Sequence, residues 1–370
     1  MPLTAHQALG AQVRGELGSA ALLQARPIQL HWPPPPACRL AWQARRLRRL
    51  FWVVAVGVSL SACTPLSFLA ANTAAAFSHF SKQANLAYGP ATTNKLDVYL
   101  PTRPGHRPIV VFFYGGGWDS GDKASYKFAG AALADAGIIA VLPNYTLYPQ
   151  GKFPTFMQDA AQAVAWTRAH ARDWGGDPDQ LYLLGHSAGA HIAVLLALDQ
   201  EYLQQVGGSS HWLRGVVGLS GPYDFLPFKE AYLNDLFGPP QAFANSQPIN
   251  FVRADAPPLL LMHGTRDSRV NIKNTRNLAA ALQAVGGSVS TRYFERASHE
   301  DLVAALSIPA RNRLPVFKEI KTFIARLSGD VDIFAGKLPI DQAFEHAVNV
   351  VGAPVLKVEV VGVLPDINRK

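Results

Sequence analysis

The pattern of hydrophobic and polar residues between about residues 88 and 327 switches repeatedly between two periods. KLDVYL (95–100) alternates at period two, which predicts a strand, and PIVVFFY (108–114) is continuously apolar, which predicts a central buried strand. Similar runs predict further strands at 138–145, 180–184, 213–220, 258–264 and 288–295, and the segments between them predict helices near 123–136, 156–174, 189–199, 272–285 and 315–327. Because strands and helices alternate, we expect an α/β domain with a mostly parallel central sheet and helices on both faces.

Two segments do not fit this alternation. Residues 225–257 lack strong periodicity, and we interpret them as a short cap inserted between two strands. Residues 328–370 stay unassigned, because VLKVEVVGV (355–363) has the composition of a strand that nothing after the final predicted helix requires. The predicted α/β domain therefore covers residues 88–327.

The positive charge of the chain is concentrated at its amino-terminal end. Residues 1–62 hold seven arginines against one acid, Glu16, which accounts for +6 of the formal net charge of +8. The remainder is close to neutral, so we expect no basic face for nucleic acid on the main body. The two cysteines, Cys38 and Cys63, both precede the predicted domain, which therefore has no disulfide framework and no thiolate metal site.

Residues 45–63 have the pattern of a secretory signal. A basic cluster is followed by thirteen uncharged, mostly apolar residues, Leu50 to Ala62, and then by Cys63. The end of this stretch, Leu60-Ser61-Ala62-Cys63, resembles the lipobox of bacterial lipoproteins. The resemblance implies that Cys63 is acylated and becomes the first residue of the mature chain.

Two other interpretations of this end stay open. Residues 50–81 carry no charge, so an uncleaved transmembrane anchor is possible, and residues 1–44 could be translated from a start codon placed too far upstream. The lipoprotein and the anchor agree on topology, since the arginines stay on the cytoplasmic side. We therefore expect an exported, membrane-anchored protein with a leader and signal segment at 1–62 and a linker at 63–87.

Ser187 lies between two glycines in GHSAG (185–189), directly after the predicted strand QLYLL and directly before an alanine-rich helix. This order of strand, sharp turn and helix exposes a serine hydroxyl, and glycines are needed where the tight turn leaves no room for a Cβ. The sequence therefore predicts that Ser187 is a nucleophile.

A serine nucleophile needs a base and a group that orients the base, and both follow later in the chain. Asp267 lies in the loop after the strand at 258–264, and His299 lies in the loop after the strand at 288–295. The order serine, acid, histidine resembles the α/β-hydrolase family over roughly residues 85–327, which implies the triad Ser187, Asp267 and His299. Asp224, one strand earlier, is the alternative acid.

The other histidines near these motifs have less specific interpretations. His186 and His191 are too close to Ser187 along the chain to act as its base, so we expect a loop residue and a helix residue. His263, in the HG before the acid loop, is interpreted as structural.

A glycine run after the strand at 108–114 is suited to stabilise an oxyanion with backbone amides. YGGGW (114–118) resembles the HGGG loop of hormone-sensitive-lipase-like carboxylesterases, with Tyr114 in place of histidine. The resemblance implies that the amides of Gly116, Gly117 and Ala188 form the oxyanion hole, and NYTLYPQGKFPTFMQD (144–159) resembles a further segment of the same esterases. The glycines are not a P-loop, because Gly121 is followed by Asp122 rather than lysine.

These motifs predict a serine carboxylesterase that cleaves small or medium esters through an acyl-enzyme, with no cofactor and no metal. An amidase or arylformamidase-like hydrolase would use the same triad, and a non-catalytic binding protein could share the fold. Four aromatic residues near the motifs are candidates for lining the substrate pocket or for the core: Trp118, Tyr145, Tyr148 and Phe153.

Overall fold

The computed structural model of this chain describes residues 71–73, 75, 79–102 and 107–329. The chain divides into two units, residues 1–61 and 62–370, and every described residue belongs to the second. The predicted signal segment, Cys63 and the strand proposed at 355–363 lie outside the described residues.

The described part of the chain contains eight strands in one sheet. They are β1 (Phe80–Ala87), β2 (Lys95–Pro101), β3 (Arg107–Phe113), β4 (Ile139–Pro143), β5 (Gly176–His186), β6 (Leu213–Leu219), β7 (Leu259–Gly264) and β8 (Val289–Phe294). The spatial order is β1-β2-β4-β3-β5-β6-β7-β8. Strand β2 runs antiparallel to β1 and β4, and the strands from β4 to β8 pair in parallel.

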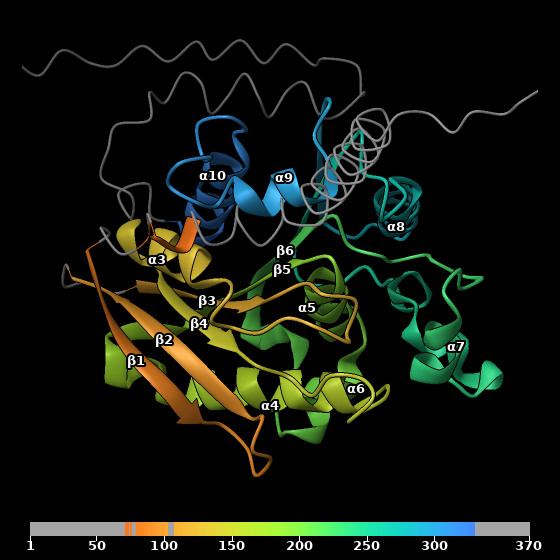
Figure 1. The fold of residues 1–370 in the computed structure, drawn as a ribbon, viewed down its shortest axis with the longest axis horizontal. Helices are drawn as coiled ribbons and strands as arrows, with labels where there is room; N and C mark the ends of the chain where they lie inside the picture. Colours follow the sequence, from red (N-terminus) through yellow and green to blue (C-terminus); the bar gives the residue numbers. More distant parts are fainter. Residues whose placement is uncertain (1–70, 74, 76–78, 103–106, 330–370) are drawn as a thin grey trace, which may run out of the picture. The chain divides into compact units, whose positions relative to one another are not determined.

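Helices connect these strands. The α-helices are α3 (Lys127–Asp135), α4 (Thr155–His170), α5 (Ala188–Leu198), α6 (Gln200–Gln205), α7 (Ala231–Phe237), α8 (Lys273–Ala284), α9 (His299–Ala304) and α10 (Val316–Ser328). Short 3-10 helices are η1 (Ala171–Trp174), η2 (Ser210–Trp212), η3 (Pro240–Ser246) and η4 (Pro248–Phe251). Figure 1 shows α3 and α10 on one side of the sheet and α4 and α6 on the other.

Burial explains why the central strands have no polar alternation. All seven residues of β3 and all five of β4 are buried, because helices cover both faces of the sheet there. Helix α5 is buried along its entire length as well, which agrees with a sequence that is apolar except for His191. The prediction of a mostly parallel sheet covered on both faces is confirmed.

Two close contacts bring helices against the sheet. A Cβ at Gly130 of α3 would lie 2.6 Å from the Tyr99 ring of β2, and a Cβ at Gly215 of β6 would lie 2.7 Å from Leu327 of α10. Glycine at these positions lets the helices approach the strands closely. None of the described helices is long and apolar enough to span a bilayer.

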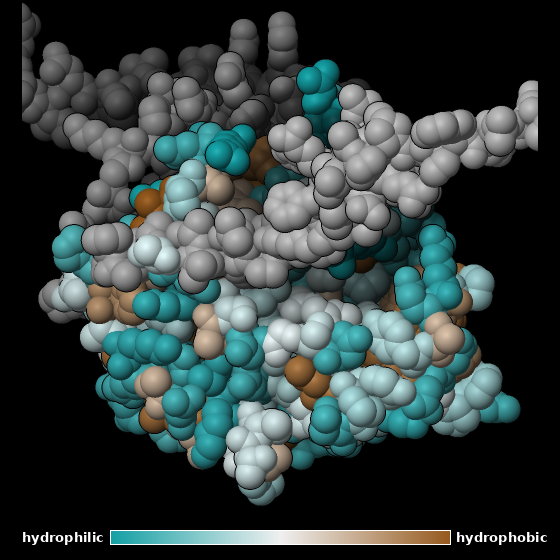
Figure 2. All heavy atoms as spheres, viewed as in Figure 1, coloured by the Kyte–Doolittle hydropathy of each residue, from teal (hydrophilic) through white to brown (hydrophobic). Residues whose placement is uncertain are grey.

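Strand β1 corrects the predicted linker at 63–87, because residues 80–87 pair with β2 as the edge of the sheet. Six of the eight residues of β1 are exposed, and its sequence FSKQANLA has no apolar alternation that would predict a strand. The face over β1 is hydrophilic in Figure 2, as suits an exposed sheet edge. Asn72 of the same segment accepts a hydrogen bond from the amide of Phe128, at 2.9 Å, in the first turn of α3.

A buried carboxylate fastens this edge strand to the domain. Asp97 of β2 is 1% exposed, and its oxygens lie 2.6 Å from Lys123 Nζ and 2.7 Å from Lys82 Nζ. Asp97 also accepts a hydrogen bond from the amide of Asn85 at 2.9 Å. Burial alone would raise the pKa of Asp97, but the two lysines hold it below its usual value.

Replacing Asp97 with Asn should therefore destabilise the fold strongly, because Lys123 would keep a buried charge without its counter-ion. We expect the free energy of unfolding, measured by urea denaturation, to fall by about 3–5 kcal/mol. Asp179→Asn is the control, since Asp179 pairs with Arg168 on an exposed part of the surface. That substitution should cost less than about 1 kcal/mol. Equal losses in the two variants would contradict a special role for the Asp97 cluster.

Candidate active site

Ser187 occupies a sharp turn between β5 and α5. Its backbone has φ of 55° and ψ of −121°, a left-handed conformation that non-glycine residues adopt rarely. Its amide donates to the carbonyl of Leu219 in β6 at 2.9 Å, and its side chain is half-buried. This is the strained elbow that the sequence predicts for a nucleophile.

The two glycines that flank the elbow are required by close backbone approach. A Cβ at Gly185 would lie 2.1 Å from the carbonyl oxygen of Gly189, and a Cβ at Gly189 would lie 2.0 Å from that of Phe113. Any side chain at either position would displace backbone rather than a flexible side chain. The start of α5 therefore lies directly against the carboxyl end of β3, where the glycine run begins.

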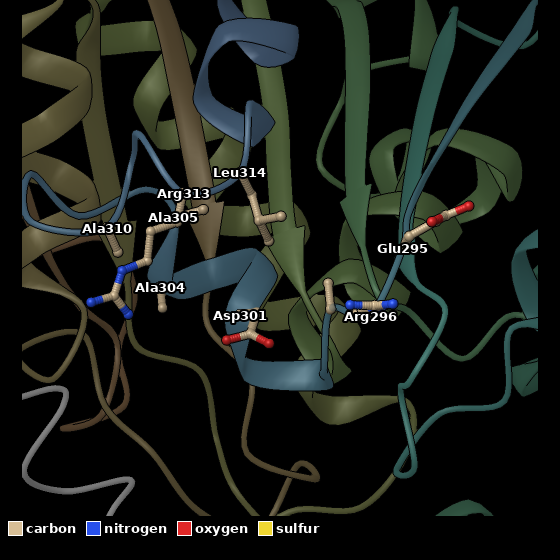
Figure 3. Close-up of a pocket in the computed structure, with 9 residues that line it drawn as sticks. Glu295, Arg296, Asp301, Ala304, Ala305, Ala310, Arg313 and Leu314 are labelled. Carbon is tan, nitrogen blue, oxygen red and sulfur yellow. The ribbon is translucent and has the colours of Figure 1, made fainter.

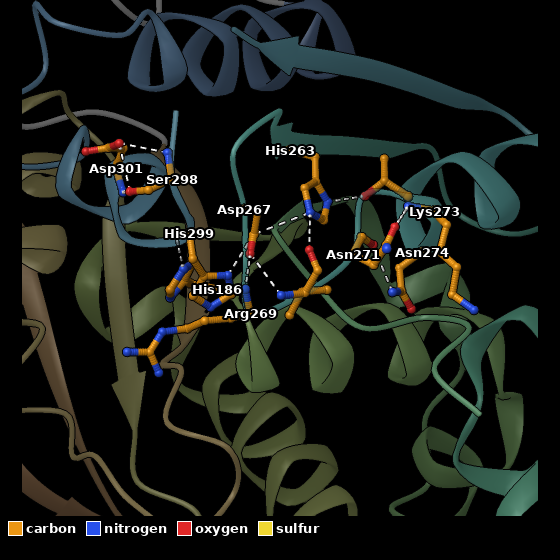
Figure 4. A network of polar contacts seen from close by, with 12 residues as sticks. His186, His263, Asp267, Arg269, Asn271, Lys273, Asn274, Ser298, His299 and Asp301 are labelled. Carbon is orange, nitrogen blue, oxygen red and sulfur yellow. Dashed lines mark hydrogen bonds and ion pairs between the residues drawn. The ribbon is translucent and has the colours of Figure 1, made fainter. Parts of the chain in front are cut away.

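Asp267 and His299 form a hydrogen-bonded pair beyond the ends of β7 and β8 (Figure 4). The Nδ1 of His299 donates to Oδ2 of Asp267 at 2.8 Å. The other carboxylate oxygen accepts backbone amides from Arg269 at 3.0 Å and Val270 at 2.8 Å. Since Nδ1 carries the proton, Nε2 of His299 is left with the lone pair that a general base requires.

A second histidine holds the same carboxylate. His263 Nε2 lies 3.3 Å from Oδ2 of Asp267 and 3.0 Å from the carbonyl of Val270, while its Nδ1 lies 2.8 Å from the Thr275 hydroxyl. Burial alone would raise the pKa of Asp267, but hydrogen bonds from His263 and His299 hold it well below its usual range. Asp267 is therefore ionised and able to stabilise a protonated His299.

The alternative acid, Asp224, is engaged elsewhere. Its Oδ2 accepts a hydrogen bond from Asn277 of α8 at 2.6 Å, and its amide donates to Asn274 of the same helix at 2.7 Å. The structure brings His299 together with Asp267 and not with Asp224.

His299 is the first residue of α9, whereas the sequence analysis places it in a loop. The helix begins with a capping box, in which Ser298 N donates to Asp301 Oδ2 at 2.7 Å and Asp301 N donates to Ser298 Oγ at 3.4 Å. The signal SHED (298–301) was present in the sequence. The capped first turn fixes the backbone that carries the imidazole.

The predicted oxyanion loop follows β3 and has a glycine-dependent backbone. Gly116 has φ of 138° and Gly117 has φ of 60°, and a Cβ at Gly116 would lie 2.1 Å from the carbonyl oxygen of Ser120. A Cβ at the preceding Gly115 would lie 3.0 Å from Cβ of Ser187. The loop and the nucleophile elbow are therefore in contact.

The carbonyl partners in this loop set the direction of the predicted donors. The carbonyl of Gly116 accepts from the amide and the hydroxyl of Ser120, at 3.0 and 2.8 Å, and the carbonyl of Ser187 accepts from Ala190 N at 3.0 Å. In a planar trans peptide the N–H points opposite to the C=O, so these bonds direct the amides of Gly117 and Ala188 away from the carbonyl partners. Within the described residues, neither amide donates to a backbone carbonyl.

Tyr232 of α7 is a site residue that no motif in the sequence predicts. Its hydroxyl donates to the carbonyl of Gly117 at 3.1 Å, which attaches the predicted cap segment 225–257 to the oxyanion loop. Burial raises the pKa of Tyr232 to about 12, so the hydroxyl keeps its proton.

The four aromatic candidates divide between core and surface. Tyr145 is 1% exposed, stacks on Tyr114 with ring centroids 4.5 Å apart, and donates to the Tyr114 carbonyl, so it belongs to the core. Trp118 is 4% exposed and packs among the rings of Phe225 and Phe237. Tyr148 and Phe153 are only partly buried.

A pocket of about 210 Å³ lies beside α9 (Figure 3). Its lining residues are Glu295, Arg296, Ala297, Asp301, Ala304, Ala305, Ala310, Arg313 and Leu314. No residue predicted for the triad or the oxyanion hole lines it. In the part of the chain that the structure describes, no group of three His, Cys, Asp or Glu side chains is arranged so that it could hold a metal ion.

Comparison with known proteins was made against families, curated sequences and solved structures. Residues 96–282 match the BD-FAE family model, which is about half of the chain. The chain is 30% identical over 264 residues to the probable isoprenylcysteine alpha-carbonyl methylesterase ICMEL1 of Arabidopsis thaliana, covering 65% of this chain and 55% of that protein. It is 31% identical to the esterase LipC of Mycobacterium tuberculosis, covering 54% and 55% of the two chains. The chain thus spans little more than half the length of these relatives.

Solved esterase structures share the fold. Esterase B of Lactobacillus rhamnosis aligns with a TM-score of 0.63 at 22% identity, covering 76% of this chain and 97% of that one. A thermophilic esterase of Thermogutta terrifontis aligns with a TM-score of 0.56 at 24% identity, covering 70% and 94%. The sheet order, the elbow and the family match agree, and the chain belongs to the BD-FAE family, with the α/β-hydrolase fold.

Proposed function

We propose that this protein is a serine carboxylesterase that hydrolyses small or medium carboxylic esters through an acyl-enzyme. The observation that carries the proposal is the 2.8 Å bond from His299 Nδ1 to Asp267, which leaves His299 Nε2 free to act as base near the strained elbow of Ser187. The curated relatives with esterase names support the same reaction class.

The mechanism assigns each proton. His299 Nε2 takes the proton of the Ser187 hydroxyl while Oγ bonds to the ester carbonyl carbon, and the amides of Gly116, Gly117 and Ala188 stabilise the oxyanion. His299 then gives this proton to the leaving alkoxide as the C–O bond breaks, which produces the acyl-enzyme and an alcohol. Water, activated by the same nitrogen, releases the acid and restores Ser187. Asp267 stays ionised throughout and stabilises the imidazolium.

Ser187→Ala should abolish ester hydrolysis and leave the fold intact, because a half-exposed small side chain contributes little packing. We expect kcat on p-nitrophenyl acetate to fall by at least about 10⁴-fold. An organophosphonate probe should label the wild type at Ser187 and leave the variant unlabelled, with unchanged circular dichroism in both. An active Ser187→Ala variant would refute the proposal, and testing formanilides alongside the esters separates an esterase from an arylformamidase-like enzyme.

Asp267→Asn should lower kcat by about 10³- to 10⁴-fold, since an amide cannot stabilise the imidazolium and disturbs the tautomer of His299. Asp224→Asn is the matched control on the preceding loop. It should change kcat by less than about 10-fold, because Asp224 contacts α8 rather than His299. Steady-state kinetics on the two variants decides between the acids, and the reverse order of effects would move the acid to Asp224.

We also propose that the protein is exported and held at a bacterial membrane through a lipid on Cys63. The basic cluster, the thirteen-residue apolar stretch and Leu-Ser-Ala-Cys support this. A cysteine that carries more than one acyl chain anchors stably, at about 0.8 kcal/mol per buried methylene. An uncleaved transmembrane segment is the alternative and gives the same orientation.

Cys63→Ser should block lipid attachment and processing in a bacterial host. We expect labelled palmitate to enter the wild type only, and the variant to accumulate as a longer precursor on immunoblots of membrane fractions. Cys38→Ser serves as control and should be processed normally. A wild type that keeps its full precursor mass and takes up no palmitate would favour the transmembrane anchor.

A further inference from the structure

His186, the residue before the nucleophile, contacts two other segments of the site. It is the last residue of β5 and only 4% exposed, rather than a loop residue as its position in the motif suggests. Its Nε2 lies 3.0 Å from the carbonyl oxygen of His299, and the two imidazole rings are 4.7 Å apart, centroid to centroid (Figure 4). A Cβ at Gly115 would lie 2.9 Å from its Nδ1, so the ring also packs against the start of the oxyanion loop.

The contact with His299 determines the tautomer of His186. A carbonyl oxygen can only accept, so the bond requires a proton on Nε2 and leaves the lone pair on Nδ1. That Nδ1 is buried and has no hydrogen-bond partner among the described residues. A proton there would be buried without an acceptor, which is costly.

The surrounding charges favour the same neutral state. The titratable and charged groups that act on His186 are His299, Asp267 and Arg269. Burial, together with the nearby His299, lowers the pKa of His186 to about 3. The two neighbouring imidazoles therefore differ in their role as proton acceptors. His186 stays neutral, while His299 accepts a proton during the proposed reaction.

We propose that His186 is a positioning residue for the general base, which fixes the backbone of His299 relative to the Ser187 elbow through its Nε2–H bond. This inference rests on the proposed esterase function. The bond joins the residue before the nucleophile to the backbone of the proposed base itself, so its loss would let the start of α9 and the elbow move apart. A misplacement of about 1 Å between reacting groups can cost about 10²-fold in rate.

Two substitutions separate positioning from packing. His186→Leu removes the donor, and His186→Gln keeps an N–H group that can reach the same carbonyl. With active sites counted by paraoxon titration, we expect kcat per site of the leucine variant to fall about 10- to 100-fold while KM changes less than about 3-fold. The glutamine variant should recover kcat to within about 5-fold of the wild type. A leucine variant with wild-type kcat per titrated site would overturn the inference.

His191 provides a matched control five residues further along. It is also fully buried, its Nε2 lies 2.7 Å from the carbonyl of Ser246, and burial lowers its pKa to about 4. His191→Leu should lower the stability of the fold in urea, as His186→Leu does. It should not produce the loss of kcat per titrated site that His186→Leu produces and His186→Gln rescues. If both histidines show the same kcat loss and the same rescue, the effect is a general one of buried imidazoles and the inference fails.

Two further measurements do not depend on the variants folding. ¹⁵N NMR of the wild type should show His186 protonated on Nε2, and a proton on Nδ1 instead would contradict the proposed bond. His186 should add no proton to the acid limb of the kcat/KM profile at pH values above about 4, since its pKa is lowered to about 3, and a limb with a two-proton slope there would also contradict the proposal. Failure of the esterase proposal can be distinguished from failure of this inference. In that case the wild type would be inactive on all esters and would not be labelled at Ser187.

Discussion

The close approach between the start of α5 and the carboxyl end of β3 is the constraint on which the site depends. A Cβ at Gly189 would meet the carbonyl of Phe113 at 2.0 Å, and one at Gly185 would meet the carbonyl of Gly189 at 2.1 Å. Because the backbones touch, Ser187 and the glycine loop after β3 are neighbours without any side chain between them. Because β3, β5 and β6 pair in parallel, the elbow after β5 and the glycine loop after β3 lie at the same edge of the sheet.

At this edge, a series of hydrogen bonds sets the protonation states of the proposed acid and base. Thr275 lies at Nδ1 of His263, His263 Nε2 lies at Asp267, and Asp267 accepts the Nδ1 proton of His299. Each contact leaves the next group a single favourable protonation state, so the negative charge stays on Asp267 and the free lone pair on His299 Nε2. The location of the negative charge and of the free lone pair is therefore set by the whole hydrogen-bonded network, and not by the proposed triad residues alone.

The sequence predicted what depends on order along the chain and failed where contacts are tertiary. Ser187, Asp267 and His299 each follow an apolar run, so their common edge could be expected from parallel strands alone. The sequence favoured Asp267 and kept Asp224 as the alternative acid, because the distinction depends on how the loops after β6 and β7 lie against α8. Strand β1 was missed because an exposed edge strand needs no apolar alternation, and the Asp97 cluster that attaches it joins residues far apart in sequence. His186 and Tyr232 gave no signal for a similar reason, since each acts through a backbone carbonyl of a distant segment.

Three side chains around the site donate hydrogen bonds to backbone carbonyls. Ser120 holds the carbonyl of Gly116, Tyr232 holds that of Gly117, and His186 holds that of His299. A carbonyl fixed on one side of a planar peptide fixes the N–H on the other side, so the bonds from Ser120 orient the Gly117 amide, a proposed oxyanion donor. The bonds from Tyr232 and His186 hold the backbone of the same loop and of His299 in place. Preorganised donors of this kind need no rearrangement as charge develops in the transition state. The cap segment is thereby tied to this site, since Tyr232 connects the position of α7 to the geometry of the predicted oxyanion loop.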